Sequence, residues 1–227
     1  MSPQIFKEDI FMRTFQVSTN PYGDGRLYTR KDVSFEPGKL TCLVGCNGSG
    51  KSTLMMLLKD KLKKEKDILI LDYDDRKNGG HNLMEKMAFF GDIEGVASMF
   101  VSSEGERIYQ GVGQFIGTMR RQILKKNPKE IWIFLDAVGS GMSIDKIQDI
   151  KLTVPIIVDD NSDKDVYFIV STNEYEFASG SDCIDVTTFQ HVKFINYPDY
   201  RTYVMKTAEK KAKRYERISK ELREADI

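Results

Sequence analysis

Residues 40–58 are LTCLVGCNGSGKSTLMMLL, and this stretch decides the fold. Its first part, residues 40–45, is short, apolar and partly β-branched, which is typical of a buried strand. The part that begins at Ser52 carries apolar residues at helical spacing and predicts a helix over residues 52–65. Several glycines lie between the two parts. We therefore expect a buried strand, a glycine-rich loop and a helix in direct succession.

The loop matches a phosphate-binding motif. Residues 45–52 satisfy G-x-x-x-x-G-K-[ST] between a strand and a helix, the context that the motif requires. The glycines let backbone amides converge on phosphate oxygens, and the start of the helix adds its positive end. Lys51 is expected to reach the β- and γ-phosphates, and the Ser52 hydroxyl to ligate Mg²⁺. The predicted ligands are ATP and Mg²⁺, and the predicted contacts are Asn47, Gly48, Ser49, Gly50, Lys51, Ser52 and Thr53.

A second metal-ordering group is expected at the end of a neighbouring buried strand. Asp136 ends the run IWIFLD, residues 131–136, in which every earlier residue is apolar. This is the Walker-B arrangement, in which a carboxylate at a strand end holds the Mg²⁺ of a phosphate loop. The predicted metal ligands are therefore Ser52 and Asp136.

The rest of the chain alternates between strand-like and helical segments. Strands are predicted over residues 67–74, 130–138, 154–160 and 166–173, and a helix over residues 108–126. Such alternation predicts parallel strands joined by helical crossovers, hence an α/β fold with a mostly parallel sheet flanked by helices. Shorter strands within residues 15–19 and 31–40 predict an N-terminal antiparallel element.

Composition narrows the class of protein. The 227 residues carry equal numbers of basic and acidic side chains, so bulk charge favours neither nucleic acid nor membrane. No apolar run approaches the ~20 residues of a membrane span, and the N-terminus has no signal-peptide core. Cys42, Cys46 and Cys183 form no disulfide framework. These features predict a cytoplasmic protein.

At this point the sequence resembles the ATP-binding-cassette (ABC) ATPases over most of residues 10–205. The phosphate loop is similar to that of the family, and SSEGER (102–107) resembles its signature motif in the variant that ends with glutamate. The order of phosphate loop, signature and Walker B is the family's order. The resemblance implies the P-loop NTPase fold of the ABC type and an ATP-dependent head-to-tail homodimer. In that dimer Ser103, Gly105 and Glu106 of one subunit would meet the nucleotide held by the other.

The resemblance also implies an aromatic residue that stacks on adenine and a loop that contacts the second subunit. Tyr22 lies at a suitable distance upstream of Lys51, and Tyr28 is a competitor; either is also suited to packing in a strand. The loop is similar to SGMS, residues 140–143, whose final serine fits the soluble members of the family that are not transporters.

Three departures from the family pattern bear on catalysis. Ala137 occupies the position of the catalytic glutamate, and Asn173 that of the switch histidine. No glutamine occurs between Lys51 and Gln110, so the glutamine loop of transporters is missing or unrecognisable. Alanine cannot orient water, so slow hydrolysis is expected. Asp145 is the next carboxylate considered for this task.

The sequence leaves several functions open. We expect an ATPase domain over residues 1–205 and a charged helix over residues 206–227, with Tyr215 and Ile218 in a thin apolar stripe. The leading hypothesis is a soluble ABC-type ATPase with slow hydrolysis. The alternatives are the nucleotide-binding subunit of a membrane transporter, a non-hydrolysing ATP sensor, and a DNA-associated repair-type ATPase.

Overall fold

The computed structural model describes residues 12–23, 25–74, 89, 102–139 and 142–225. Its main sheet has the strand order β4-β5-β6-β3-β7-β8, and all neighbours are parallel except β8, which runs antiparallel to β7. The strands are β4 (Ile68–Asp74), β5 (Glu130–Asp136), β6 (Asp165–Ser171), β3 (Leu40–Val44), β7 (Asp182–Asp185) and β8 (His191–Val192). A separate antiparallel pair consists of β1 (Arg13–Gln16) and β2 (Asp32–Phe35).

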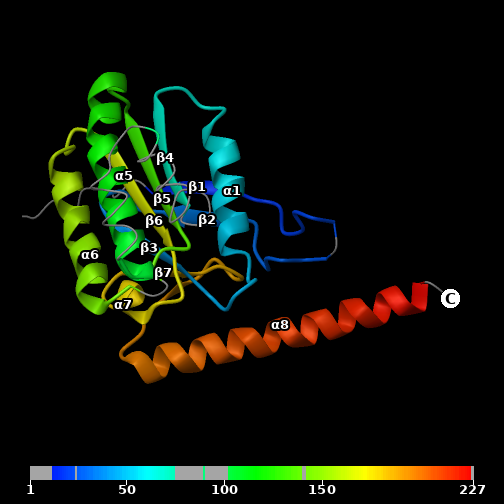
Figure 1. The fold of residues 1–227 in the computed structure, drawn as a ribbon. Coiled ribbons are helices and arrows are strands. Elements are labelled where there is room, and N and C mark those ends of the chain that lie inside the picture. The colour runs from blue at the N-terminus through cyan, green and yellow to red at the C-terminus, as the bar shows by residue number, and fades with distance from the viewer. Residues whose placement is uncertain (1–11, 24, 75–88, 90–101, 140–141, 226–227) are drawn as a thin grey trace, which may run out of the picture.

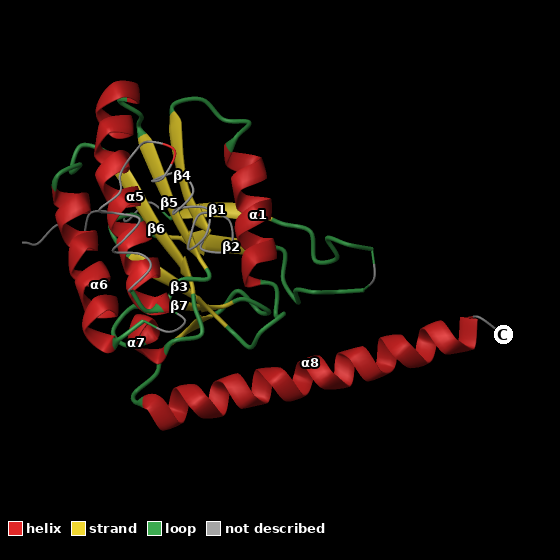
Figure 2. Cartoon of the chain, in the orientation of Figure 1, coloured by secondary structure: helices red, strands yellow, loops and turns green. Residues whose placement is uncertain are grey.

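Helices cover both faces of this sheet (Figures 1 and 2). The helix α1 (Lys51–Leu62) and the β1-β2 pair lie on one face, and α5 (Glu104–Lys126) and α6 (Ile144–Asp159) lie on the other. The short helix α7 (Tyr175–Ala178) follows β6, and the long α8 (Tyr197–Ala225) runs past the end of the sheet. The predicted fold class is confirmed: a mostly parallel α/β sheet between helices, with an N-terminal antiparallel element.

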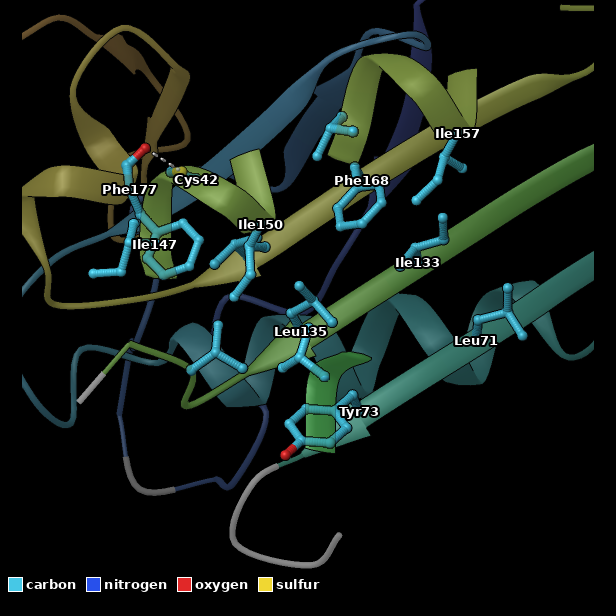
Figure 3. Close-up of a cluster of buried hydrophobic side chains, with 14 of the residues drawn as sticks. Cys42, Leu71, Tyr73, Ile133, Leu135, Ile147, Ile150, Ile157, Phe168 and Phe177 are labelled. Atoms are coloured by element: carbon cyan, nitrogen blue, oxygen red, sulfur yellow. Dashed lines mark hydrogen bonds between the residues drawn. The ribbon is translucent and has the colours of Figure 1, made fainter. Parts of the chain in front are cut away.

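The alternation of side chains along β5 shows how the sheet joins two cores. Ile131, Ile133 and Leu135 point into the core shared with α5 and α6, whereas Trp132 and Phe134 point into the core shared with α1 and the β1-β2 pair. Successive side chains of a strand alternate between faces, so a buried central strand is apolar at every position. Figure 3 shows the first core, where the Cys42 thiol donates a hydrogen bond to the Phe177 carbonyl at 3.2 Å. Cys42 therefore has a packing role.

The strand predicted over residues 154–160 is wrong, because residues 154–159 are the last part of α6 and Asp160 is its C-cap. The buried residues Ile147, Ile150, Val154 and Ile157 recur at helical spacing along α6. Pro155 lies inside the helix and removes one backbone donor, but it is exposed, so water can reach the carbonyl that loses its partner. The apolar run favours a strand only when it is separated from the preceding turns of α6, which carry the helical spacing.

Two further differences concern neighbours and boundaries. β5 does not lie beside β3 as predicted for the Walker-B strand, because β6 is inserted between them. The helix α5 begins at Glu104, ahead of the predicted residue 108, since Ser103 and Glu106 form a capping box. The helix α8 begins at Tyr197, ahead of residue 206. The division of the chain into domains stays a prediction.

Candidate phosphate-binding site

A pocket of about 540 Å³ opens where β3, β5 and β6 end. Parallel strands end at the same edge of a sheet, and ligands of such sheets bind beyond their carboxyl ends. The pocket brings together most of the predicted site residues. Its lining consists of Tyr22, Leu27, Asn47, Gly48, Gly50, Lys51, Ser52, Thr53, Asp136, Ala137, Val138, Ser171, Thr172, Asn173, Glu174, Arg214, Tyr215 and Ile218.

The loop between β3 and α1 has the geometry of an anion cradle. Gly50 precedes α1 with φ 102°, in the left-handed region, and a Cβ there would lie 2.8 Å from a Leu27 methyl carbon. No side chain caps the helix at this residue, so the first amides of α1 remain available to a ligand. Amides at a helix start together with its dipole favour phosphate. The loop therefore fits a phosphate group.

Lys51 is held at the base of the pocket by three oxygen atoms. Its Nζ donates to the carbonyls of Gly45 at 2.8 Å and Cys46 at 3.1 Å, and to Asn173 Oδ1 at 2.8 Å. The side chain is buried, and burial lowers the pKa of Lys51 to about 8. The charge of Asp136 favours the protonated form of the Lys51 amine, and the charge of Lys211 disfavours it. A polyanion in this pocket would meet a positive charge that lacks full solvation.

Ser52 and Asp136 bring a hydroxyl and a carboxylate together. Ser52 Oγ donates to Asp136 Oδ1 at 3.1 Å, although the two residues lie on α1 and β5 with β6 between the two strand ends. Asp136 is buried and continues directly from the apolar strand β5. Hard oxygen ligands of this kind are those that Mg²⁺ prefers. The pair fits a magnesium ion bound together with phosphates.

The two candidate adenine-stacking residues differ in their surroundings. Tyr22 is 62% exposed and lines the pocket, with its hydroxyl 2.9 Å from Thr53 Oγ1. Tyr28 is fully buried, packs against Phe189, and donates its hydroxyl proton to the Gly50 carbonyl at 2.8 Å. A fully buried ring cannot stack on a ligand, so Tyr28 supports the loop, and of these two candidates Tyr22 is the one placed to meet a base.

The catalytic positions also line the pocket. Ala137 is half-buried and has φ 58°, and Asn173 bridges Lys51 to Asn47 by donating to Asn47 Oδ1 at 2.5 Å. Glu174, which sequence reasoning missed, lines the same pocket, and partial burial, helped by Glu176, raises its pKa. Asp145 is exposed and is not part of the lining. Glu174 is therefore better placed than Asp145 to contact a ligand.

Some predicted residues lie away from the pocket of their own chain. Ser103, Gly105 and Glu106 form the first turn of α5 and are not in the lining. Ser103 Oγ accepts from the Glu106 amide at 3.3 Å, and the Glu106 carboxylate accepts from the Ser103 amide at 2.7 Å, which lowers the Glu106 pKa. Ser49, within the loop itself, is buried and is not in the lining. Residues 140–141 of the SGMS loop lie outside the described residues.

Comparison with known proteins gives partial matches. The family model described as "ABC transporter" matches residues 28–115. The ATP-binding protein Uup of Haemophilus influenzae is 34% identical over 76 residues, which cover 30% of this chain and 12% of that protein. The putative HMP/thiamine import ATP-binding protein YkoD of Bacillus subtilis is 38% identical over 77 residues, which cover 33% of this chain and 14% of that protein. These matches support the ABC ATPase family.

Two solved structures are similar to this chain at low identity. One is the ADP conformation of an ATP-binding cassette of an ABC transporter, with 15% identity and a TM-score of 0.47 over 87% of this chain and 96% of that one. The other is a nucleotide-free ATP-binding cassette from an ABC transporter, with 14% identity and a TM-score of 0.46 over 87% and 97%. Among the described residues, no helix is both long and apolar enough to cross a membrane.

Proposed function

We propose that this chain is an ABC-type ATPase domain that binds ATP with Mg²⁺ in the pocket beyond β3 and hydrolyses it slowly. The observation that carries the proposal is the convergence of Lys51 with the Ser52–Asp136 pair beside an uncapped helix start. A cation, a hydroxyl and a carboxylate at a glycine-rich loop are the parts that phosphoryl-transfer sites share. The three free, buried cysteines suit a reducing compartment such as the cytoplasm.

Each group has a defined task in this proposal. The amides of residues 47–53 hold the β- and γ-phosphates, and Lys51 leaves its carbonyl partners to neutralise their charge. Ser52 and Asp136 hold the metal, which screens the phosphate charge when bound. Tyr22 packs on the base from its exposed position next to Thr53.

Hydrolysis requires more than these groups. Water must attack the γ-phosphorus while the bond to the ADP oxygen breaks, and the proton of the water must reach a base. Ala137 offers no carboxylate for that proton, and Asn173 cannot act as an imidazole. Positioning and charge neutralisation remain, so slow turnover is expected rather than none.

In a dimer, the signature-like residues at the start of α5 would contact the nucleotide of the second subunit. The Ser103 hydroxyl uses its oxygen as the cap of α5, which leaves its proton to be donated to a γ-phosphate. The start of the 23-residue helix α5 adds a positive dipole end. We propose that two chains close head-to-tail, so that each α5 start meets the ATP bound by the other chain.

A cap-preserving substitution tests this closure. Ser103→Asp keeps an N-cap acceptor but places a negative charge against the γ-phosphate, so the ATP-dependent dimer should be lost while each monomer still binds ATP. Sedimentation with ATP-Mg²⁺ should show dimers of the parent chain and monomers of the variant.

Ser103→Thr and Thr118→Asp are the matched controls. The first retains both the cap and the hydroxyl, and the second places the same charge on the exposed side of α5. Both should dimerise as the parent does. A parent chain that stays monomeric with ATP-Mg²⁺ would refute the closure.

The pKa of Lys51 predicts a pH dependence of ATP binding. A polyphosphate favours the charged amine, so binding takes up a proton wherever the free protein has lost it. Since the pKa in the free site is about 8, affinity should fall as pH rises through this value, by about tenfold from pH 7 to pH 9. Calorimetry at pH 9 in two buffers with different ionisation enthalpies should reveal the proton uptake. Equal affinities at both pH values, with no uptake, would show that Lys51 is charged throughout.

The membrane-transporter subunit stays an alternative, and its support is the named import function of one relative. It requires a membrane partner, which the ATPase proposal does not. Purification of the chain from its native cell, followed by identification of stoichiometric membrane proteins, distinguishes the two.

A further inference from the structure

One face of the helix α8 packs along the phosphate loop. Tyr203 donates its hydroxyl proton to the Val44 carbonyl at 3.3 Å, and Thr207 Oγ1 accepts from the Cys46 amide at 3.2 Å. Lys211 Nζ donates to the Asn47 carbonyl at 2.7 Å. These three residues are four apart, which places them on one side of the helix. α8 is therefore attached to successive residues of the strand and loop that form the site.

The next turns of α8 form part of the pocket wall. Arg214, Tyr215 and Ile218 line the pocket together with Tyr22 and Leu27. Arg214 donates to the Gly25 carbonyl at 3.3 Å, and Ile218 Cδ1 lies 3.6 Å from the position that a Cβ on Gly25 would take. The helix thus passes from the phosphate loop, at Lys211, to the segment that carries Tyr22, at Ile218. This course covers about two helical turns.

The charges of this wall suit an anion. Within the described part of the chain, neither Lys211 nor Arg214 has a carboxylate partner in an ion pair. Lys211 lies so close to the loop that a Cβ on Gly48 would be 2.5 Å from its amine. Next to a phosphate cradle, two positive side chains without an acidic partner attract a bound polyanion.

Tyr215 adds an aromatic surface to the same wall. The Lys211 amine lies 5.3 Å from the centre of the Tyr215 ring, and the ring is exposed although it lines the pocket. Tyr22 is also exposed and lines the same pocket, so the pocket offers two aromatic rings suited to packing on a planar base.

We propose that α8 completes the nucleotide site, with Lys211 as a second lysine on the phosphates and Tyr215 packed on the base together with Tyr22. This inference rests on the proposed function, because it assigns contacts to the same ATP. On binding, Lys211 exchanges the Asn47 carbonyl for a phosphate oxygen, while Thr207 and Tyr203 keep α8 in place.

Two substitutions test the two contacts by calorimetry with ATP and AMP. Lys211→Ala should weaken ATP binding by about tenfold, the effect of losing one charge-assisted hydrogen bond. It should weaken AMP binding much less. Lys213→Ala is the matched control, since it removes the same charge from an exposed position of α8 outside the lining. Tyr215→Ala should weaken the binding of ATP and of AMP by similar factors, because both nucleotides carry the base.

The outcomes separate this inference from the proposed function. If Lys51→Ala binds ATP as the parent does, or the parent binds none, the function itself fails. If Lys51→Ala loses ATP while Lys211→Ala and Tyr215→Ala bind it like the parent, only the role of α8 fails. Tighter ATP binding by Lys211→Ala would also overturn the inference, because it would show that α8 obstructs the site.

Discussion

Replacing Lys51 by alanine is expected to abolish ATP binding. The Lys51 amine is buried at the base of the pocket with two carbonyls and the Asn173 side chain as its partners. Each hydrogen bond from a charged group contributes ~1.5–3 kcal/mol, so the loss of two phosphate contacts weakens binding by on the order of 100-fold or more. Calorimetry with ATP-Mg²⁺ should show no resolvable heat for the variant.

Lys61→Ala is the control for this experiment. It removes a lysine from the exposed side of the same helix, α1, and should bind ATP as the parent chain does. Thermal unfolding of both variants without nucleotide checks that the fold is kept. Undiminished ATP binding by Lys51→Ala would exclude this pocket as the site.

The sheet and the loop could be predicted from sequence because local patterns determine them. The apolar strand before Gly45, the glycine-rich loop and the helix after it follow each other without interruption, so no distant contact was needed. Asp136 was identified in the same way, as the polar end of an apolar strand. Its position relative to β3 was not, because the insertion of β6 depends on which strands pair in space.

The segment 154–160 shows where local patterns fail. Four apolar residues beside Pro155 favour a strand when the segment is considered alone, and only the period that starts at Ile147 indicates a helix. The start of α5 is ambiguous for a similar reason: Ser103 and Glu106 belong to the signature-like motif, but their Ser-x-x-Glu pattern also marks a helix start.

Besides Glu174, the part of the site that sequence analysis missed comes from α8. Tyr215 and Ile218 were noticed only as members of an apolar stripe, and Lys211 was one basic residue among many. A stripe indicates that a helix packs against something, but not against what. Tyr203, Thr207 and Lys211 lie more than 150 positions along the chain from residues 44–47, which they contact. Such contacts can be seen only in the folded structure.

Replacing Ala137 by glutamate is expected to raise ATP turnover by about tenfold or more. Ala137 follows the metal-binding candidate Asp136 and lines the pocket, so a carboxylate there would point toward the water that attacks the γ-phosphate. A positioned base contributes ~10²–10⁴ in rate, and part of this gain is withheld because Asn173 is unchanged. The left-handed backbone at φ 58° is already adopted by a residue with a Cβ, so glutamate adds little strain. Single-turnover assays measure the gain.

Ala137→Gln is the control, because glutamine has the size and shape of glutamate but no carboxylate. It should show no gain in turnover. If the proposed ATP-bound dimer forms, Ala137→Glu should also shorten its lifetime, because the γ-phosphate proposed to join the subunits would be lost sooner. Turnover of the parent chain near ~1 s⁻¹, with no gain from Ala137→Glu, would contradict the prediction. Glu174 would then be the carboxylate proposed to prepare the water, since it lines the same pocket and partial burial, helped by Glu176, raises its pKa. In that case Glu174→Gln should remove the turnover and leave ATP binding intact.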